Sequence, residues 1–254
     1  MIIPVLLYHS VSDGPVRRSW GAVSRAQFES HVEVIAASSR QSLTISVLAS
    51  MLRGERSLAP RPVAVTFDDG YSDTYEAVDA LRQHGLGATV YVTAGQIGRT
   101  QWLSPAQIAV LAELPGVEVG AHGIRHRRLD ELDDAELEEE VHGAKHWLEK
   151  LTSHSVDSFS YPHGAYDGRV RDAVIRAGYR SATAVKNAVS HQDDDPFAIA
   201  RFTVTAATSA QRIAEVLLGK GVPLSWAGER VRTRAYRMAR RSRGRLRGTR
   251  SETC

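Results

Sequence analysis

The sequence contains a single cysteine, Cys254, at its last position. One thiol cannot form an internal disulfide, and it leaves no thiolate cluster for a structural zinc site. The sequence also lacks an apolar run long enough to cross a bilayer, and no basic leader precedes the first apolar segment, Ile2–Leu7. We therefore expect a protein without disulfides or membrane-spanning segments, located in the cytoplasm and at most peripheral at the inner face of the membrane.

The sequence has little net charge, +3, but this value averages two unlike regions. Residues 229–254 hold ten arginines against two glutamates, a net +8, while the other residues hold 22 basic and 27 acidic side chains, a net −5. We interpret 229–254 as a flexible Arg-rich tail behind a domain of residues 1–228. The tail is either a solvated extension or a segment that contacts an anionic membrane surface. In the second case, each basic residue near the lipid headgroups stabilises binding by about 1 kcal/mol. We expect no nucleic-acid partner, because Tyr236 alone in the tail could stack on bases.

The order of hydrophobic patterns predicts an α/β fold. A chain of 254 residues that is 43% hydrophobic can bury a sizeable core as one domain. Its alternation of strands and helices indicates a mostly parallel sheet with right-handed crossovers. The expected strands lie near 3–8, 63–67, 88–93, 117–121, 158–161, 181–184 and 198–204, and the expected helices near 24–38, 72–84, 104–113, 133–151, 168–177 and 208–218. The number of strands alone does not choose between a closed barrel and an open sheet.

Two adjacent carboxylates, Asp68 and Asp69, end the apolar run Val63–Phe67. Such a run is typical of a strand buried on both faces, and the carboxyl ends of such strands are where ligands gather in α/β proteins. Neighbouring side chains on extended backbone point to opposite sides, so one acid can bind a metal while the other handles protons. The residues alone do not say which does which. An isolated Asp-Asp-Gly is more often a solvated turn.

A pair of histidines, His122 and His126, follows the predicted strand 117–121. If the residues between them form one helical turn or a tight loop, both imidazoles can face one metal ion. Two imidazoles and one carboxylate leave a coordination position open for water, which separates a catalytic zinc site from a structural one. His142 and His146 have the same spacing but lie in a charged amphipathic helix, and we interpret them as part of its solvated face.

A third motif, Phe159–Asp167, follows that acidic helix. With Thr66–Gly70 and the histidine pair in this order, the chain resembles the polysaccharide deacetylase family, also called the chitooligosaccharide deacetylase homology domain of carbohydrate esterase family four. The similarity runs from about residue 3 to residue 218. It implies a distorted (β/α)7 barrel with residues 1–228 as one catalytic domain. It also implies a metal-dependent hydrolase that removes N-acetyl or O-acetyl groups from an amino-sugar glycan or a glycan precursor.

The resemblance also implies roles for individual residues. Asp68 corresponds to the general base, and the backbone N–H of His163 corresponds to the donor that stabilises the oxyanion. Tyr161 and His163 correspond to residues that line the substrate groove. The implied metal ligands are Asp69, His122 and His126. Zinc is the expected metal, although cobalt, nickel or manganese fits similar ligands.

The chain departs from the family pattern at two places. Many members carry an arginine that orients the catalytic aspartate two residues before the proline of the third motif, and this chain has Ser160 there. The late Leu-x-His element that supplies a general acid is missing as well. We predict that His9 replaces it, because Tyr8–His9 resembles the branch of poly-N-acetylglucosamine deacetylases in which an N-terminal histidine reaches the active site. The alternatives are a His9 that binds a backbone carbonyl, and His191 as a weaker candidate acid.

Two rival functions remain at this point. A related metal hydrolase could cleave a non-sugar amide, since the site selects a carbonyl and not the group that bears it. The chain could instead be a non-catalytic glycan-binding protein, which Ser160 and the missing late histidine favour and the intact acid and histidine set opposes. The expected cytoplasmic location favours a precursor as substrate, such as a lipid-linked or oligomeric N-acetylated sugar.

Overall fold

The computed structural model describes residues 1–13 and 21–226, so the Arg-rich tail predicted over 229–254 lies outside the described residues. The strands are β1 (Ile2–Ile3), β2 (Val5–Tyr8), β3 (Gln41–Ser42), β4 (Pro62–Phe67), β5 (Ala88–Val92), β6 (Val117–Ala121), β7 (Ser158–Ser160), β8 (Ser181–Val185), β9 (Ser190–His191) and β10 (Ile199–Thr203). The α-helices are α1 (Arg25–Ala37), α2 (Ile45–Leu52), α3 (Thr74–Gln83), α4 (Pro105–Glu113), α5 (Asp134–Glu138), α6 (Ala144–Thr152), α7 (Gly168–Arg176) and α8 (Ala210–Leu217). Short turns are η1 (Ala94–Gln96), η2 (Leu129–Glu131), the π-helical η3 (Glu139–Gly143) and η4 (Pro162–Gly164).

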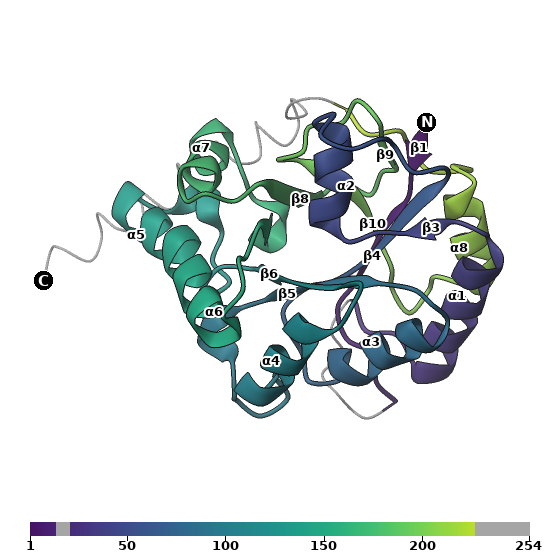
Figure 1. Ribbon diagram of the computed structural model, residues 1–254, viewed down its shortest axis with the longest axis horizontal. Coiled ribbons are helices and arrows are strands. Elements are labelled where there is room, and N and C mark those ends of the chain that lie inside the picture. The colour runs from purple at the N-terminus through teal and green to yellow at the C-terminus, as the bar shows by residue number, and fades with distance from the viewer. Residues whose placement is uncertain (14–20, 227–254) are drawn as a thin grey trace, which may run out of the picture.

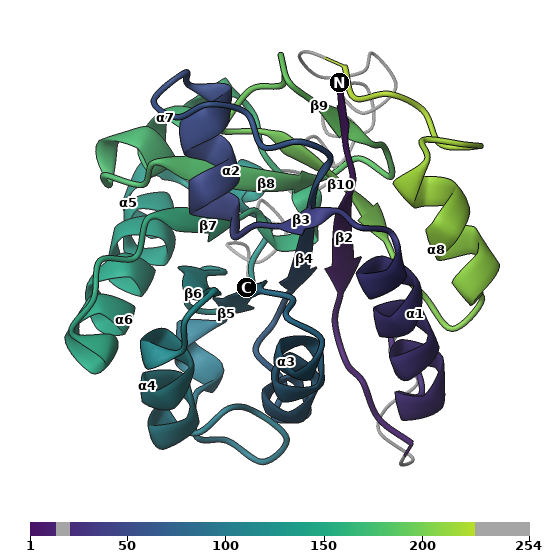
Figure 2. The same ribbon diagram turned by 45° about the vertical axis from the view of Figure 1, so that its right-hand side comes forward.

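Seven parallel strands close a barrel in the order β2, β10, β8, β7, β6, β5 and β4, because β4 also pairs with β2. The helices surround these strands, with α1 and α8 packed side by side (Figures 1 and 2). Outside the barrel, β3 extends the edge of β4, and β1 pairs with β9 in antiparallel fashion. The predicted fold, a distorted (β/α)7 barrel in a single domain, is therefore confirmed.

The inner wall of the barrel is apolar at its amino-terminal end. Side chains alternate along each strand, so that Val63, Val65 and Phe67 pack outward under the helices while Ala64 points inward. Helix α2 lies across this end of the barrel (Figure 1) and packs its apolar side chains against the inward ones. The cluster comprises Ile3, Val5, Ile45, Leu48, Ala49, Ala64, Tyr91 and Ile199. Helix α2 is thus the floor of the barrel.

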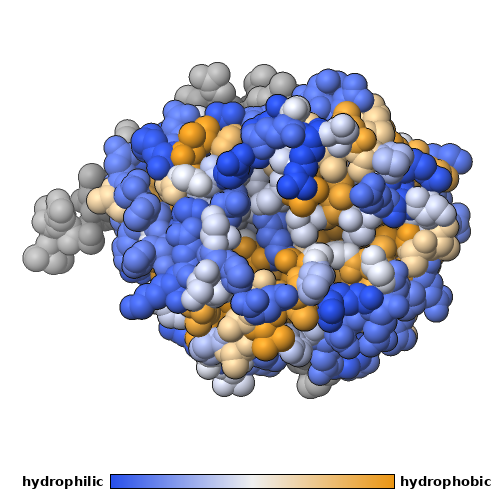
Figure 3. Space-filling view, in the orientation of Figure 1, coloured by the Kyte–Doolittle hydropathy of each residue, from blue (hydrophilic) through white to orange (hydrophobic). Residues whose placement is uncertain are grey.

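Helix α2 is absent from the sequence prediction, together with the short strands β3 and β9. Its sequence, ISVLASML, spans only eight residues and has two polar side chains, Ser46 and Ser50, so its amphipathic pattern is short and weak. Tertiary contacts complete its start, where Glu118 on β6 accepts a hydrogen bond from the Ser46 N–H at 3.1 Å. The surface on this side is mostly hydrophilic, with apolar groups gathered near its centre (Figure 3).

The helix predicted over 133–151 forms as one run of α5, η3 and α6. Asp133 caps its start, accepting a hydrogen bond from the Glu136 N–H at 2.8 Å. In its middle, η3 is a π-helical turn, a local widening of the helix that is frequent at functional sites. Nothing in the sequence predicted this turn.

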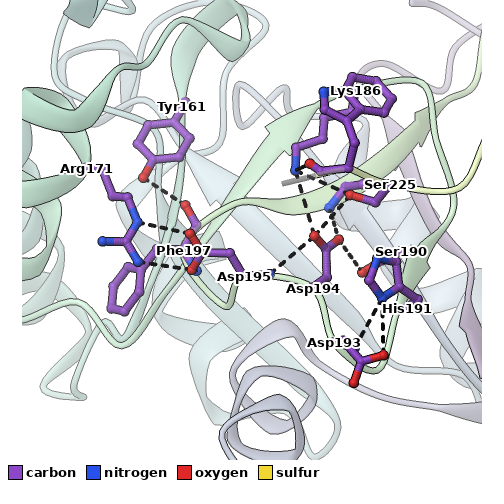
Figure 4. Close-up of polar contacts among 12 residues, drawn as sticks. Tyr161, Arg171, Lys186, Ser190, His191, Asp193, Asp194, Asp195, Phe197 and Ser225 are labelled. Carbon is purple, nitrogen blue, oxygen red and sulfur yellow. Dashed lines mark hydrogen bonds and ion pairs between the residues drawn. The ribbon is translucent and has the colours of Figure 1, made fainter. Parts of the chain in front are cut away.

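The last described residues are tied to the barrel by a buried polar group (Figure 4). Lys186 Nζ lies 3.8 Å from an Asp194 carboxylate oxygen, and both side chains are almost fully buried. Ser225 Oγ donates to the same oxygen at 3.0 Å. In the ranges that the structure describes, no helix is both long and apolar enough to span a bilayer.

Candidate metal-binding active site

The inner wall becomes polar toward the carboxyl ends of the strands, where Asp68 follows β4. Arg201 on β10 reaches across the interior and holds both oxygens of this carboxylate, with Nη1 to Oδ1 at 2.6 Å and Nη2 to Oδ2 at 2.7 Å. Ser160 on β7 donates to Asp68 Oδ2 at 3.1 Å and accepts from Arg201 Nη2 at 2.9 Å. All three residues are at most 2% exposed. A bidentate pair of this kind fixes the orientation of a carboxylate as well as its charge.

The charge state of Asp68 follows from two opposing effects. Burial is the larger single influence and raises the pKa of Asp68, but the charge and hydrogen bonds of Arg201 contribute in the opposite sense. The net pKa of Asp68 lies well below the usual aspartate value, so the carboxylate is ionised at neutral pH. Removing either partner of such a buried pair leaves an uncompensated charge, at a cost of about 3–5 kcal/mol.

Sequence reasoning missed Arg201. The third motif lacks its usual arginine, and Ser160 cannot supply the charge, but Arg201 supplies it from a different strand. A signal was available, because an arginine in the middle of Ile199–Thr203, an otherwise apolar strand, needs a buried acidic partner. The sequence did not reveal which acid that partner is.

Asp69, His122 and His126 form a separate cluster next to Asp68. Their ligand atoms all lie within 4.8 Å of one another. Asp69 Oδ1 lies 3.2 Å from His126 Nε2 and 3.6 Å from His122 Nε2. A tetrahedral zinc ion with ligands at 2.0–2.2 Å keeps those ligand atoms roughly 3.3–3.6 Å apart, which is close to the two distances from Asp69 to the histidines. Asp69 has a left-handed φ of +75°, a local backbone strain of the kind found at functional sites.

The two histidines are prepared as neutral ligands. His122 Nδ1–H donates to the Ser160 carbonyl oxygen at 2.8 Å, which leaves the Nε2 lone pair for a metal. Burial lowers the pKa of His122 to about 3 and also lowers the pKa of His126. Their short distances to Asp69 are therefore not ion pairs at neutral pH. Burial, with the charge of Asp68, raises the pKa of Asp69 to about 6. A bound cation opposes that shift because metal ligands must be deprotonated, so the donor set fits a divalent metal ion.

His163 lies at the rim of this cluster. Its ring centroid is 4.3 Å from that of His126, and its Nε2 lies 3.2 Å from the His126 carbonyl oxygen. Both residues have left-handed backbone, with φ of +58° at His163 and +56° at His126. Two loops from different strands therefore meet at the carboxyl end of the barrel, beside the proposed metal ligands.

Tyr161 does not line an open groove, contrary to the sequence prediction. Its side chain is completely buried. The hydroxyl donates to the Phe197 carbonyl oxygen at 3.0 Å (Figure 4), and the ring stacks on Tyr166 at a centroid distance of 4.5 Å. Tyr161 follows the inward-facing Ser160 by one residue, so the alternation of β7 turns it outward into the core beneath the helices.

The two other histidine candidates lie at opposite ends of the barrel. His9 follows β2, and its electrostatic influence lowers the pKa of Asp69, which indicates proximity. Gly21 packs against the His9 ring so closely that a Cβ there would lie 2.5 Å from Nδ1. His191 belongs to β9, which pairs with the amino-terminal β1, far from the carboxyl ends of the strands. Its Nδ1 accepts a hydrogen bond from the Asp193 N–H at 3.2 Å (Figure 4).

The chain is similar in sequence and in fold to known proteins. The family pattern described as "Polysaccharide deacetylase" matches residues 55–182, half of the chain. The "Putative polysaccharide deacetylase YxkH" of Bacillus subtilis is 27% identical over 208 residues, which cover 82% of this chain and 73% of that protein. A peptidoglycan-N-acetylglucosamine deacetylase of Bacillus cereus is 31% identical over 121 residues, or 47% of this chain and 54% of that protein. The fold is similar to that of the Streptococcus pyogenes deacetylase PplD in complex with acetate, with a TM-score of 0.78 at 19% identity, covering 85% of this chain and 98% of that one. The chain therefore belongs to the polysaccharide deacetylase family.

Proposed function

We propose that this protein is a metal-dependent deacetylase that removes N-acetyl groups from an amino-sugar glycan or glycan precursor. The observation that carries the proposal is the convergence of Asp69, His122 and His126 on one point beside an Asp68 held by Arg201. The family supports an acetylated glycan as substrate class. The similarity to a protein named peptidoglycan-N-acetylglucosamine deacetylase favours an N-acetylated amino sugar over an O-acetylated one.

The proposal gives the two adjacent acids different tasks. Asp69, His122 and His126 hold the metal, because their donor atoms are mutually close. Asp68 accepts the proton of the attacking water. With a pKa held low by Arg201, Asp68 is a weak base. A divalent metal ion lowers the pKa of a water molecule from about 15.7 toward 7 and polarises an acyl oxygen, which is the assistance that a weak base needs.

The leaving amine needs a proton, and we propose that His9 donates it. Its influence on the pKa values of both Asp68 and Asp69 supports a position at the cluster. The backbone N–H of His163 is the proposed donor to the developing oxyanion, since its loop lies against His126. These roles require the substrate amide to lie between His9 and His163.

A catalytic site is favoured over a glycan-binding site without chemistry. The absence of arginine at position 160 was one reason to expect a degenerate site, and Arg201 supplies the missing charge to Asp68. A buried bidentate arginine and a strained acid are costly features that sugar binding alone does not require.

The test is acetate release from a panel of N-acetylglucosamine oligomers by the zinc-loaded full-length protein. Chelated protein is the first control, and a panel of small non-sugar amides is the second. We expect release from the oligomers that depends on metal. Release from the simple amides alone, or equal release after chelation, would contradict the proposal.

A further inference from the structure

Glu140 is a fully buried carboxylate that the proposed chemistry does not use. It lies in the π-helical turn η3, in the middle of the long acidic helix. Its Oε2 accepts two hydrogen bonds from successive backbone N–H groups, of Ile124 at 2.8 Å and of Arg125 at 2.9 Å. These two residues belong to the loop that joins His122 to His126. A carboxylate from another element therefore occupies the centre of the metal-ligand loop.

The loop has the form of an anion-binding nest. Successive backbone N–H groups that converge after a left-handed residue create a concave positive site, and Gly123 has a φ of +72°. A Cβ on Gly123 would lie 3.0 Å from Glu140 Oε2, so a larger residue would crowd the carboxylate. Proteins commonly use such nests for phosphate or other anions. Here the chain fills the nest with its own side chain.

Further contacts tie the same loop to the π-helical turn. Arg125 Nη1 lies 3.3 Å from Glu140 Oε1, which engages the second carboxylate oxygen. The Ile124 side chain covers Gly143, where an added Cβ would come within 2.8 Å of Ile124 Cδ1. The loop is thus anchored by charge at Glu140 and by packing at Gly143. Both anchoring residues belong to η3, so the irregular turn and the loop are matched to each other.

We propose that Glu140 is a positioning residue for the metal centre, fixing the His122–His126 loop so that His126 meets Asp69. The inference rests on the proposed function in that a divalent metal is what His126 binds. His122 is held directly by the Ser160 carbonyl, but His126 has left-handed backbone and a side chain that is 29% exposed. Without an anion in the nest, the two N–H groups lose their partner and the loop loses its set conformation. Changes to groups that orient metal ligands typically weaken metal affinity about 10–100-fold.

The experiment is a cobalt titration of metal-free full-length protein, followed by visible absorption, for wild type, Glu140→Gln and Glu140→Ala. Glu139→Gln is the matched control, because Glu139 is adjacent, lies half exposed and pairs with the same Arg125 at 2.6 Å. We expect cobalt to bind about 10-fold more weakly to Glu140→Gln, which keeps a neutral acceptor, and about 100-fold more weakly to Glu140→Ala. Glu139→Gln should bind within about twofold of wild type, as is usual for surface substitutions.

Melting temperatures of the metal-free proteins separate positioning from simple support of the fold. A lower melting temperature in both Glu140 variants with unchanged cobalt affinity would overturn the inference. Wild type that binds cobalt but releases no acetate would overturn only the proposed function. Wild type that binds no cobalt would overturn both.

Discussion

The two halves of the site are held in place in different ways. On the inner half, Asp68, Ser160, Arg201 and His122 lie within the barrel and are at most 2% exposed. Their positions come from strands and from direct bonds between side chains. On the outer half, His126 lies in a loop and is oriented indirectly, through backbone N–H groups that bind Glu140. A rigid scaffold can place a side chain by strand register alone, whereas a loop at its rim needs a partner from another element.

The sharpest contrast between the halves should appear when each histidine is removed. His122→Ala and His126→Ala should both abolish metal binding and acetate release. His122→Ala should also lower the free energy of unfolding by about 2–4 kcal/mol, because it empties a buried site and leaves the Ser160 carbonyl unpaired. His126→Ala should change it by less than about 1 kcal/mol in the metal-free protein.

Chemical denaturation of both metal-free variants, beside a cobalt titration, measures this difference. Equal destabilisation by the two substitutions would remove the distinction between the halves. Cobalt binding that survives in either variant would remove that histidine from the ligand set.

Asp68→Asn should isolate chemistry from metal binding on the inner half. We expect acetate release to fall about 10²–10⁴-fold, the usual contribution of a general base, with metal content unchanged. The metal content of the purified variant is measured by atomic emission and its turnover by acetate release. Asp69→Asn is the matched partner and should lose metal instead. The same result for both variants would contradict the proposal that Asp68 is the base and Asp69 is a metal ligand.

Arg201→Lys tests whether the orientation of Asp68 matters beyond its charge. Lysine keeps the positive charge but cannot bind both carboxylate oxygens in one plane. We expect turnover to fall about 10–100-fold with little change in KM, because Arg201 orients the reacting carboxylate without touching the substrate. Arg171→Lys is the control, because Arg171 makes a similar bidentate pair with Asp195 outside the site (Figure 4). Equal activity of the two variants would show that charge alone suffices.

Ser160→Ala should give the smallest effect of the series. It removes one hydrogen bond to Asp68 while Arg201 remains, so we expect a loss of about 1 kcal/mol in stability and a severalfold loss of turnover. Ser158→Ala, two residues earlier on the same inward face, breaks a bond to Tyr91 at 2.6 Å and should lower stability without touching turnover. A large loss of activity in Ser160→Ala would mean that the serine, rather than the arginine, sets the orientation of Asp68.

Much of the barrel and the core of the site could be predicted because they depend on short-range patterns. Short strand patterns locate all seven of the barrel strands, and Asp68, Asp69 and His122 each lie at or just after the end of one. Parallel strands bring their carboxyl ends together, so adjacency in space follows from topology. The Arg-rich tail and the division of the chain at residue 228 remain predictions.

The rest depends on contacts between residues far apart in the chain. Arg201 lies 133 residues from Asp68, and only barrel closure through β10 brings them together. The sequence pattern does not distinguish Glu140 from its acidic neighbours on the same helix. Only the π-helical widening of that helix turns Glu140 toward the His122–His126 loop. The prediction for Tyr161 was wrong for a simpler reason. Successive side chains along β7 point to opposite sides, so Ser160 faces the barrel interior while Tyr161 packs in the core between the barrel and the helices.

The floor of the barrel determines from which side the proposed substrate can reach the site. Helix α2 and the apolar layer above it cover the amino-terminal end of the barrel, opposite the carboxyl ends of the strands where Asp68 lies. In the proposed reaction, the acetylated sugar therefore arrives and acetate leaves on the same side of the barrel.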